Sequence, residues 1–222
     1  MAGTFHSLRR ANAARLRRKV SDSIFEKKRA LRRTLAAIRR GVSQDQARAA
    51  ALALRRRILS AGFLLRAQRL SFYLPQNGEC DLLPLINTAL ERGKDCYLPL
   101  VPARTGRPMR FARLGASRHW HHNRFGIPEN HDPHPRSARH LDVMFMPLLG
   151  FDASGNRLGM GGGFYDATLA YLRARRVWRK PLLIGVAYEA QKVVEIPAEA
   201  WDVPLDYIVT ERTIYGFSPR QA

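Results

Sequence analysis

The sequence predicts a three-layer α/β fold in which helices cover both faces of a mainly parallel β-sheet. Short apolar segments typical of buried strands alternate along the chain with amphipathic segments of helical length, a pattern typical of parallel sheets. The chain has 222 residues, of which 45% are hydrophobic. That content suffices for one sizeable core, whereas two domains would be cramped. We therefore expect a single α/β domain over residues 23–222, preceded by a mobile basic tail over residues 1–22.

Two helices are expected before the alternation begins. Apolar residues at helical spacing predict the first over Ser23–Arg40, and Gly41 follows as a stop signal. Ser43 and Gln46 have the capping-box spacing that predicts a second helix over Asp45–Ser60. The segments expected next are a strand at Arg69–Leu74, a helix at Leu82–Arg92 capped by Asp81, strands at Asp95–Val101 and Met109–Leu114, and a polar loop over residues 115–140.

The second half of the chain continues the alternation on both sides of a glycine-rich segment. Its first strand is expected at Asp142–Leu149. The apolar run there, Val143–Phe151, contains Pro147 and is far shorter than the ~18 residues that a membrane span needs. No membrane helix is therefore expected, and no secretory signal is expected because the N-terminus lacks an apolar h-region. The predicted fold is completed by a helix over Phe164–Arg176 and strands at Leu182–Tyr188 and Leu205–Thr210.

The formal charge of +20 is concentrated towards the N-terminus. Residues 1–40 hold thirteen Lys or Arg but only Asp22 and Glu26 as acids, a net charge of +11. Such basic segments favour polyanions in general, including nucleotides, nucleic acids and anionic membranes. The two cysteines, Cys80 and Cys96, form neither a CxxC pair nor a zinc-ligand pattern, which favours a reduced, intracellular protein.

The glycine-rich segment over residues 155–166 carries the strongest functional signal. Four glycines within Gly159–Gly163 allow backbone conformations and close approaches that side chains would block. Successive N–H groups there could converge on a phosphate, and Arg157 adds a forked cationic donor. Asp166 falls in the first turn of the expected helix, where a carboxylate could hold Mg²⁺ against phosphates. We expect a phosphate-binding loop, with a plain flexible turn as the alternative.

This segment lacks two familiar phosphate motifs. A Walker A loop requires GK[ST] after its glycines, whereas Phe164 follows Gly163. The dinucleotide fingerprint GxGxxG would begin at Gly159 and would need a glycine where Phe164 stands. Asp152, which precedes the glycines, is interpreted as a turn residue that stabilises the chain through an Asx-type hydrogen bond.

The glycine-rich segment and its flanks closely resemble the signature of the 5-formyltetrahydrofolate cyclo-ligases, also called 5,10-methenyltetrahydrofolate synthetases. Other segments resemble the same family, so the resemblance covers about residues 24–212. The resembling segments are Lys28–Arg32, Ser71–Asp81 with Glu79, Phe125–Glu129, Pro147–Asp152, Gly155–Asp166, Ile184–Tyr188 with Gln191, and Trp201–Asp206.

The resemblance implies a reaction that consumes ATP and uses Mg²⁺ as a cofactor. In that family ATP phosphorylates the formyl oxygen of 5-formyltetrahydrofolate. The N10 nitrogen then attacks the activated carbon, and loss of phosphate gives 5,10-methenyltetrahydrofolate. The fold implied is Rossmann-like and resembles the sugar-phosphate isomerase and CoA-transferase group. We expect a cytoplasmic monomer with ATP and 5-formyltetrahydrofolate as substrates and with neither a membrane nor a nucleic-acid partner.

The same resemblance implies roles for individual residues. Arg157 and Asp166 are the expected catalytic residues, and Asp166 and Asp202 the expected metal ligands. Glu79 would accept hydrogen bonds from the pterin ring. The positions expected to bind ATP are Lys28, Arg32, Arg157, Leu158, Gly159, Met160, Gly161, Gly162, Gly163, Phe164 and Tyr165. Those expected to bind the folate are Leu74, Glu79, Met160, Gly161, Gly162, Gly163 and Phe164.

Several alternatives stay open at this point. The same fold could bind nucleic acid through the basic N-terminal half, although the sequence shows no recognition helix or aromatic RNA platform. It could also serve a related enzyme that acts on another heterocycle. Six histidines between His119 and His140 match no standard zinc pattern and are interpreted as part of a polar loop. The Arg-rich, acid-poor tail is also typical of mitochondrial transit peptides, so the mitochondrial matrix is the alternative location.

Overall fold

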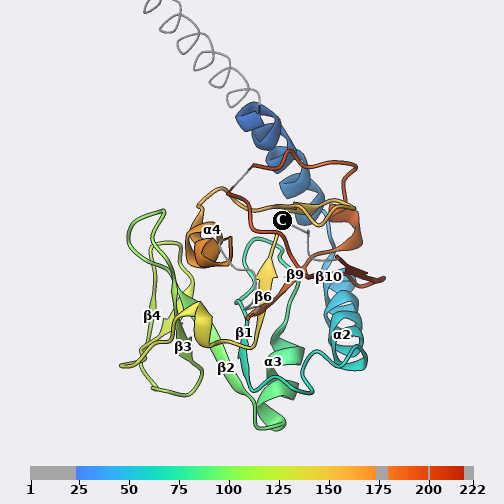
Figure 1. Cartoon of the computed structure of the whole chain (residues 1–222). Coiled ribbons are helices and arrows are strands. Elements are labelled where there is room, and N and C mark those ends of the chain that lie inside the picture. Colours follow the sequence, from blue (N-terminus) through green and yellow to red (C-terminus); the bar gives the residue numbers. More distant parts are fainter. Residues whose placement is uncertain (1–23, 174–179, 200, 218–222) are drawn as a thin grey trace, which may run out of the picture.

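The structure, a computed structural model of the chain, describes residues 24–173, 180–199 and 201–217. Within these residues the centre is a seven-stranded sheet with the order β11-β10-β9-β6-β1-β2-β3 (Figure 1). The inner strands from β10 to β2 run parallel to their neighbours, while β3 and β11 join the two edges in the antiparallel sense. The strands of this sheet are β1 (Arg69–Ser71), β2 (Asp95–Leu100), β3 (Arg110–Arg113), β6 (Val143–Pro147), β9 (Leu182–Val186), β10 (Tyr207–Val209) and β11 (Ile214–Gly216).

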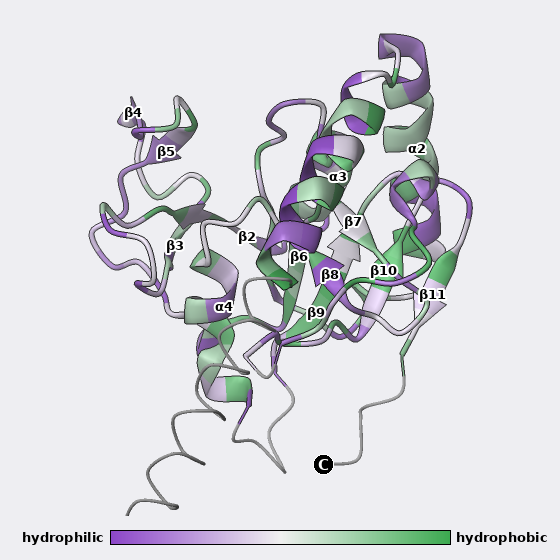
Figure 2. Cartoon of the chain, turned by 90° about the horizontal axis from the view of Figure 1, so that it is seen from above, coloured by the Kyte–Doolittle hydropathy of each residue, from purple (hydrophilic) through white to green (hydrophobic). Residues whose placement is uncertain are grey.

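Each face of the sheet carries its own hydrophobic cluster, because successive residues of a strand point to opposite sides. Phe145 of β6 packs on one face with residues of α2 (Gln44–Ser60) and α3 (Leu83–Glu91). Its neighbours Met144 and Met146 pack on the other face with residues of α4 (Phe164–Leu169) and of the short 3-10 turn η1 (Ala138–His140). Hydrophobic colouring is accordingly concentrated on the central strands in Figure 2. The predicted three-layer fold with a mainly parallel sheet is confirmed.

The first helix, which we call the N-terminal helix, is described over residues 24–40. It is anchored by Leu35, which is buried beside Leu149 and Leu158. A Cβ atom at Gly150 would lie 2.5 Å from Cδ1 of Leu35, so the present packing of Leu35 depends on the glycine. The capping box at the start of α2 is confirmed, with Gln46 N donating to Ser43 Oγ and Ser43 N donating to Gln46 Oε1.

The segment over residues 115–140 is not the plain loop that was predicted. It contains the antiparallel hairpin of β4 (Trp120–His122) and β5 (Pro128–Asn130), followed by η1. All three residues of β4 are exposed, so no alternation of apolar and polar residues marks this strand in the sequence. The hairpin forms a separate two-stranded sheet that contacts β2 and β3 through β5, and it is largely hydrophilic in Figure 2.

The predicted helix over Phe164–Arg176 is wrong in length. α4 ends at Leu169 and continues as the 3-10 turn η2 (Ala170–Leu172), while residues 174–176 lie outside the described part. Thr168 accounts for part of the difference, since its Oγ1 donates to Phe164 O and accepts from Met109 N, beside β3. Such local side-chain bonds compete with regular helix.

Three smaller features complete the fold. Asp81 was predicted to cap α3, but the N-cap position falls on Leu82, and Asp81 Oδ1 instead accepts from Leu83 N at 2.8 Å. The cysteines are buried free thiols. Within the described part of the chain, none of the helices combines the length and the apolar character that crossing a bilayer requires. The remaining elements are β7 (Gly150–Phe151), β8 (Arg157–Leu158) and the 3-10 turn η3 (Glu189–Gln191).

Candidate active site

The candidate site lies where the order of connections in the sheet reverses. From β1 the chain proceeds to β2 and β3 on one side, and from β6 to β9 and β10 on the other. In open α/β sheets ligands bind beyond the carboxyl ends of the strands at such a point. A cavity of about 770 Å³ lies there, lined by Leu74 after β1 and by Leu148 after β6. Its volume is typical of sites for small molecules.

This cavity brings together every residue that the sequence singled out for ATP, folate or metal binding. They come from the N-terminal helix, the segment after β1, the glycine-rich segment and the segment after η3, which are far apart in the sequence. The predicted residues that line the cavity are Lys28, Arg32, Leu74, Glu79, Arg157, Leu158, Gly159, Met160, Gly161, Gly162, Gly163, Phe164, Tyr165, Asp166 and Asp202.

The N-terminal helix contributes cations from one of its faces. Lys28 and Arg32 are four residues apart, which places them on the same side of a helix. Lys28 is buried, and its Nζ donates to Glu199 Oε2 at 2.6 Å and to Asp202 Oδ2 at 3.1 Å. Arg32 Nε donates to Gly159 O at 3.0 Å and so lies along the glycine-rich segment. The helix therefore binds Glu199 and Asp202 of the C-terminal segment, residues 196–206, through Lys28, and the glycine-rich segment through Arg32.

The glycine-rich segment begins as a small hairpin. β7 and β8 pair in the antiparallel sense, and the turn between them is fixed by Asp152. The Asp152 carboxylate accepts from the backbone N–H groups of Ser154, Asn156 and Ile196 at 2.9–3.0 Å. The predicted Asx-type turn at Asp152 is thus confirmed. The carboxylate also holds the C-terminal segment against the hairpin that leads into the glycines.

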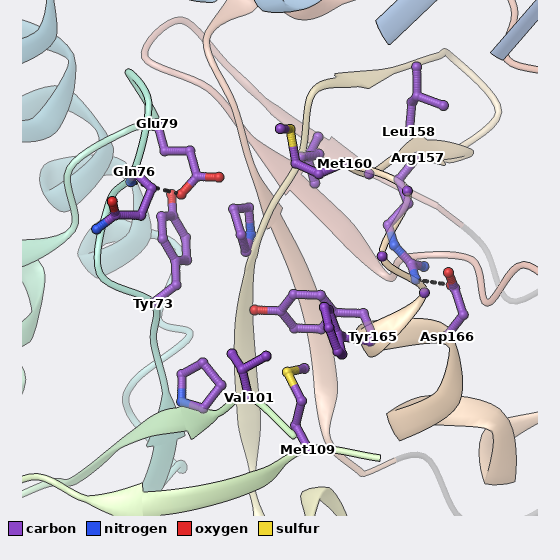
Figure 3. Close-up of a pocket in the computed structure, with 18 of the residues that line it drawn as sticks. Tyr73, Gln76, Glu79, Val101, Met109, Arg157, Leu158, Met160, Tyr165 and Asp166 are labelled. Atoms are coloured by element: carbon purple, nitrogen blue, oxygen red, sulfur yellow. Dashed lines mark hydrogen bonds and ion pairs between the residues drawn. The ribbon is translucent and has the colours of Figure 1, made fainter. Parts of the chain in front are cut away.

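Arg157 and Asp166 form the cationic and anionic pair on one side of the cavity. Arg157 Nη2 donates to Asp166 Oδ1 at 2.5 Å, and Arg157 Nη1 donates to Val203 O. The guanidinium side chain is 8% exposed, while the Asp166 side chain is 34% exposed. The Arg157 guanidinium is therefore held within the protein, whereas the Asp166 carboxylate is accessible from the cavity (Figure 3).

Glu79 lies on the opposite side of the cavity in Figure 3. Its Oε2 accepts from Gln76 N at 3.1 Å, and its Oε1 lies 3.4 Å from Arg39 Nη1. Burial raises the pKa of Glu79, although the Gln76 N–H group and the Arg39 guanidinium act against that rise. A largely buried, hydrogen-bonded carboxylate of this kind is suited to accept hydrogen bonds from the N–H donors of a flat heterocycle.

Aromatic side chains separate the two charged sides. Tyr165 lies between Glu79 and Arg157 in Figure 3, and burial raises its pKa, so its phenol stays neutral. At the mouth of the cavity Phe125 packs edge-on against Phe164, with 6.1 Å between the ring centroids. Flat apolar walls beside a few polar groups are typical of sites for aromatic ligands.

Comparison with known proteins shows to which family this chain belongs. A family model described as the 5-formyltetrahydrofolate cyclo-ligase family matches residues 24–211. The chain belongs to this family. A 5-formyltetrahydrofolate cyclo-ligase of Haemophilus influenzae is 37% identical over 144 residues, which cover 63% of this chain and 74% of that protein. The protein of the same name from Escherichia coli K12 is 35% identical over 158 residues, which cover 68% and 82%.

A solved structure agrees with the sequence comparisons. The NMR structure of Aquifex aeolicus 5,10-methenyltetrahydrofolate synthetase matches this chain with a TM-score of 0.73 and 29% identity, covering 88% of this chain and 95% of that one. The resemblance inferred from the sequence motifs is confirmed, and the chain is an enzyme of the cyclo-ligase family.

Two carboxylates, Asp166 and Asp202, are expected to bind the metal in this family, and oxygen ligands of this kind are those that Mg²⁺ prefers. Both Asp166 and Asp202 line the cavity. Each uses one oxygen in the bonds described above, Asp166 Oδ1 towards Arg157 and Asp202 Oδ2 towards Lys28 and Glu199 N. Among the described residues, no group of three or more His, Cys, Asp or Glu side chains could hold a metal ion. One or two carboxylates completed by phosphate oxygens is the usual arrangement for Mg²⁺.

Sequence reasoning missed several residues that line the cavity. Arg39 lies seven residues beyond Arg32, and the same helical spacing that linked Lys28 with Arg32 could have revealed it. Glu199 carries no such local signal, because its partner Lys28 is 171 residues away in the chain. The other cavity-lining residues that were missed include Tyr73, Gln76, Asn77, Phe125 and Trp201.

Proposed function

We propose that this enzyme converts 5-formyltetrahydrofolate to 5,10-methenyltetrahydrofolate with ATP and Mg²⁺, releasing ADP and phosphate. The family membership supports the folate reaction. The observation that carries the rest is one cavity with a carboxylate, Glu79, on one side and Arg157 on the other (Figure 3), which is also lined by Lys28 and Arg32 from the N-terminal helix. A heterocycle with N–H donors fits the first side, and a triphosphate fits the second.

The proposed chemistry needs the two substrates side by side. The formyl oxygen attacks the terminal phosphorus of ATP, forming an O–P bond as the bond to ADP breaks. The N10 nitrogen then attacks the formyl carbon, loses its proton, and displaces the oxygen as inorganic phosphate. Because phosphoryl transfer depends on positioning and charge stabilisation, the protein need supply no covalent group.

The residues of the cavity would divide this work by location. Arg157 and the Gly159–Gly163 segment would hold phosphates, assisted by Lys28 and Arg32 from the N-terminal helix. Gly161 and Gly163 have positive φ values of 94° and 66°, conformations that a side chain would disfavour. Glu79 would orient the pterin, with Leu74, Met160 and Phe164 as apolar walls.

The metal side would be served by Asp166 and Asp202. Mg²⁺ bound there would neutralise charge on the phosphate oxygens and so favour attack at phosphorus. Asp166 would keep its bond to Arg157 through Oδ1 while it faces the cavity. Asp202 would give up or share its ion pair with Lys28, which would keep its second ion pair with Glu199.

A direct assay tests the proposal. Purified protein with 5-formyltetrahydrofolate, ATP and Mg²⁺ should form the methenyl product, followed by its absorbance. Omission of ATP or chelation of Mg²⁺ should abolish the signal. No product under any of these conditions, together with salt-sensitive RNA binding, would instead support the nucleic-acid alternative.

Two substitutions test the placement of ATP. Arg157→Ala and Asp166→Ala should each lower turnover at limiting ATP by about tenfold or more, because each removes charge stabilisation in the cavity. If both variants kept wild-type turnover at limiting ATP, the glycine-rich segment would not be the ATP site.

Sequencing the N-terminus of the mature protein would decide between two cellular locations, the cytoplasm, which we propose, and the mitochondrial matrix.

A further inference from the structure

Arg39 is a buried cation beside the cavity with no role assigned above. It lies in the last turn of the N-terminal helix and is 2% exposed. Its Nε donates to Asn77 O at 3.1 Å, its Nη1 lies 3.4 Å from Glu79 Oε1, and its Nη2 lies 3.9 Å from Met160 Sδ. One guanidinium therefore joins the turn that carries Glu79 to the glycine-rich segment.

The turn that Arg39 holds, residues 76–79, has an unfavourable backbone. Asn77 has a φ value of 51°, the only positive value among the described residues other than glycine, and Gly78 follows with 80°. A left-handed conformation outside glycine costs free energy and needs support from its surroundings. A Cβ atom at Gly78 would lie 3.2 Å from the backbone oxygen of Arg39. The helix end and the turn are thus in direct contact, and the Arg39 side chain bonds the carbonyl of the strained residue.

The charge of Arg39 also matters to Glu79. The titratable groups that face Glu79 are Arg39 from the N-terminal helix, Tyr73 after β1, Cys80 in the same segment and Tyr165 from α4. Burial raises the pKa values of the two phenols and of the thiol, so these groups are neutral near pH 7. Arg39 is the cation of this set, and it favours the ionised carboxylate.

We propose that Arg39 is a positioning residue for folate binding, which fixes the 76–79 turn, orients the Glu79 carboxylate and favours its ionised form. The inference rests on the proposed function, in which Glu79 receives the pterin. Arg39 acts through Glu79, because its guanidinium borders the cavity but is only 2% exposed and already bonds Asn77 O and Glu79 Oε1. It belongs to the folate side of the cavity, although the N-terminal helix also supplies Lys28 and Arg32 to the phosphate side.

Binding measurements separate this role from a general loss of structure. Arg39→Met should weaken the binding of 5-formyltetrahydrofolate, measured by calorimetry without ATP, by about tenfold or more, because it leaves a buried carboxylate without its charged partner. The KM for ATP should stay within about twofold of the wild-type value. Arg39→Lys keeps the charge but loses the forked guanidinium donors, so its affinity for 5-formyltetrahydrofolate should lie between those of the wild type and Arg39→Met. Arg40→Met, at the exposed neighbouring position, is the matched control and should change neither constant.

The dependence on Glu79 is tested by a double-mutant cycle. In an enzyme carrying Glu79→Gln, adding Arg39→Met should weaken folate binding no further, since the group through which Arg39 acts is already gone. The acidic limb of kcat/KM for the folate should move to higher pH in Arg39→Met, because Glu79 loses the cation that lowers its pKa. Glu79→Gln should lose that limb.

Several results would overturn the inference. Additive losses in the double variant, or equal losses of ATP and folate affinity in Arg39→Met, would show a merely structural role. If Arg39→Met does not fold, Arg39→Lys carries the same comparisons. Unchanged folate affinity in Glu79→Gln would remove the contact on which the inference rests. Turnover of the wild-type enzyme tests the proposed function separately, so the two failures are distinguishable.

Discussion

The cations around the cavity are held by groups of the chain itself. Lys28 bonds Glu199 and Asp202, and Arg157 bonds Asp166. Charges removed from water are costly unless they are paired, and these pairs keep the cations in place in the free protein. In the proposed reaction, phosphates and Mg²⁺ would therefore enter a site whose charges are already balanced, and would exchange partners with it.

Removal of Lys28 tests this balance at the scale of one residue. Lys28→Met would leave Glu199 and Asp202 without their cation. We expect the free energy of unfolding to fall by about 1–2 kcal/mol, because the Lys28 side chain is 9% exposed while its partners stay partly in solvent. Urea denaturation measures the change. Adding Glu199→Gln should recover part of the loss, and a variant as stable as the wild type would contradict the interpretation.

Among the elements, the N-terminal helix matters most to the site, since its position sets where its cations lie. Leu35 fastens it over Gly150, at the start of β7, and Leu149 and Leu158 enclose the contact. The same β7–β8 hairpin leads into the glycine-rich segment. The packing of one leucine over one glycine thus fixes the helix relative to the expected phosphate site.

Gly150→Ala tests that packing. The new methyl group would lie 2.5 Å from Leu35 Cδ1 and 3.3 Å from Gln191 O, so the Leu35 side chain, the helix or the hairpin must shift. We expect a loss of about 1–3 kcal/mol in unfolding free energy, as is usual for an overpacked core, together with a raised KM for ATP. Leu35→Ala in the same chain should restore part of the KM, because it makes room for the methyl group. Unchanged kinetics in Gly150→Ala would show that the helix position does not matter.

The amino ends of three central strands are joined by Asp142. Its carboxylate accepts from Gln68 N and Arg69 N at β1 and from Lys180 Nζ before β9. Burial alone would raise the pKa of Asp142, but these hydrogen bonds outweigh it and hold the pKa at about 2. The folded protein therefore binds this proton less readily than the unfolded chain does.

A pH dependence of stability follows from that depressed pKa. The contribution of Asp142 should be complete above the ordinary aspartate pKa of about 4 and should disappear as the pH falls towards 2. Asp142→Asn should be less stable than the wild type at pH 6. The difference should shrink on acidification, as thermal unfolding between pH 2.5 and 6 would show. A difference that stays constant over this range would argue against the assignment.

At the scale of the whole molecule, charge and function are distributed differently along the chain. The matched family region begins at residue 24, whereas much of the positive charge precedes or overlaps the N-terminal helix. In the described part of this helix, Lys27, Arg29, Arg33 and Arg40 are exposed and are not among the residues that line the cavity. We expect the extreme charge to govern nonspecific binding to polyanions and not the reaction.

Deletion of residues 1–22 separates the two properties. Six Lys or Arg and one Asp leave with this segment, so the formal charge falls from +20 to +15. Turnover with 5-formyltetrahydrofolate should stay within about twofold of the full chain, while elution from heparin should need less salt because fewer cations contact the polyanion. A large loss of turnover would show that the tail takes part in the reaction.

Local features of the fold were predictable because a few neighbouring residues encode them. The capping box at Ser43 and Gln46, the Asx turn at Asp152 and the buried strand β6 all follow from short-range hydrogen bonding or from a compact apolar run. The β4–β5 hairpin and the short α4 were not predictable in this way. An exposed strand shows no apolar alternation, and α4 ends where tertiary contacts of Thr168 intervene.

The glycine-rich signature carried most of the family resemblance, because its glycines, Arg157 and Asp166 all lie within residues 155–166. Only the folded molecule shows that Glu79 faces them across one cavity, that Arg39 holds Glu79, and that Glu199 holds Lys28. These pairs join residues that are 40 and 171 positions apart. These contacts depend on the reversal of strand order between β1 and β6 and on the packing of the N-terminal helix. No short segment of the chain encodes either of these features.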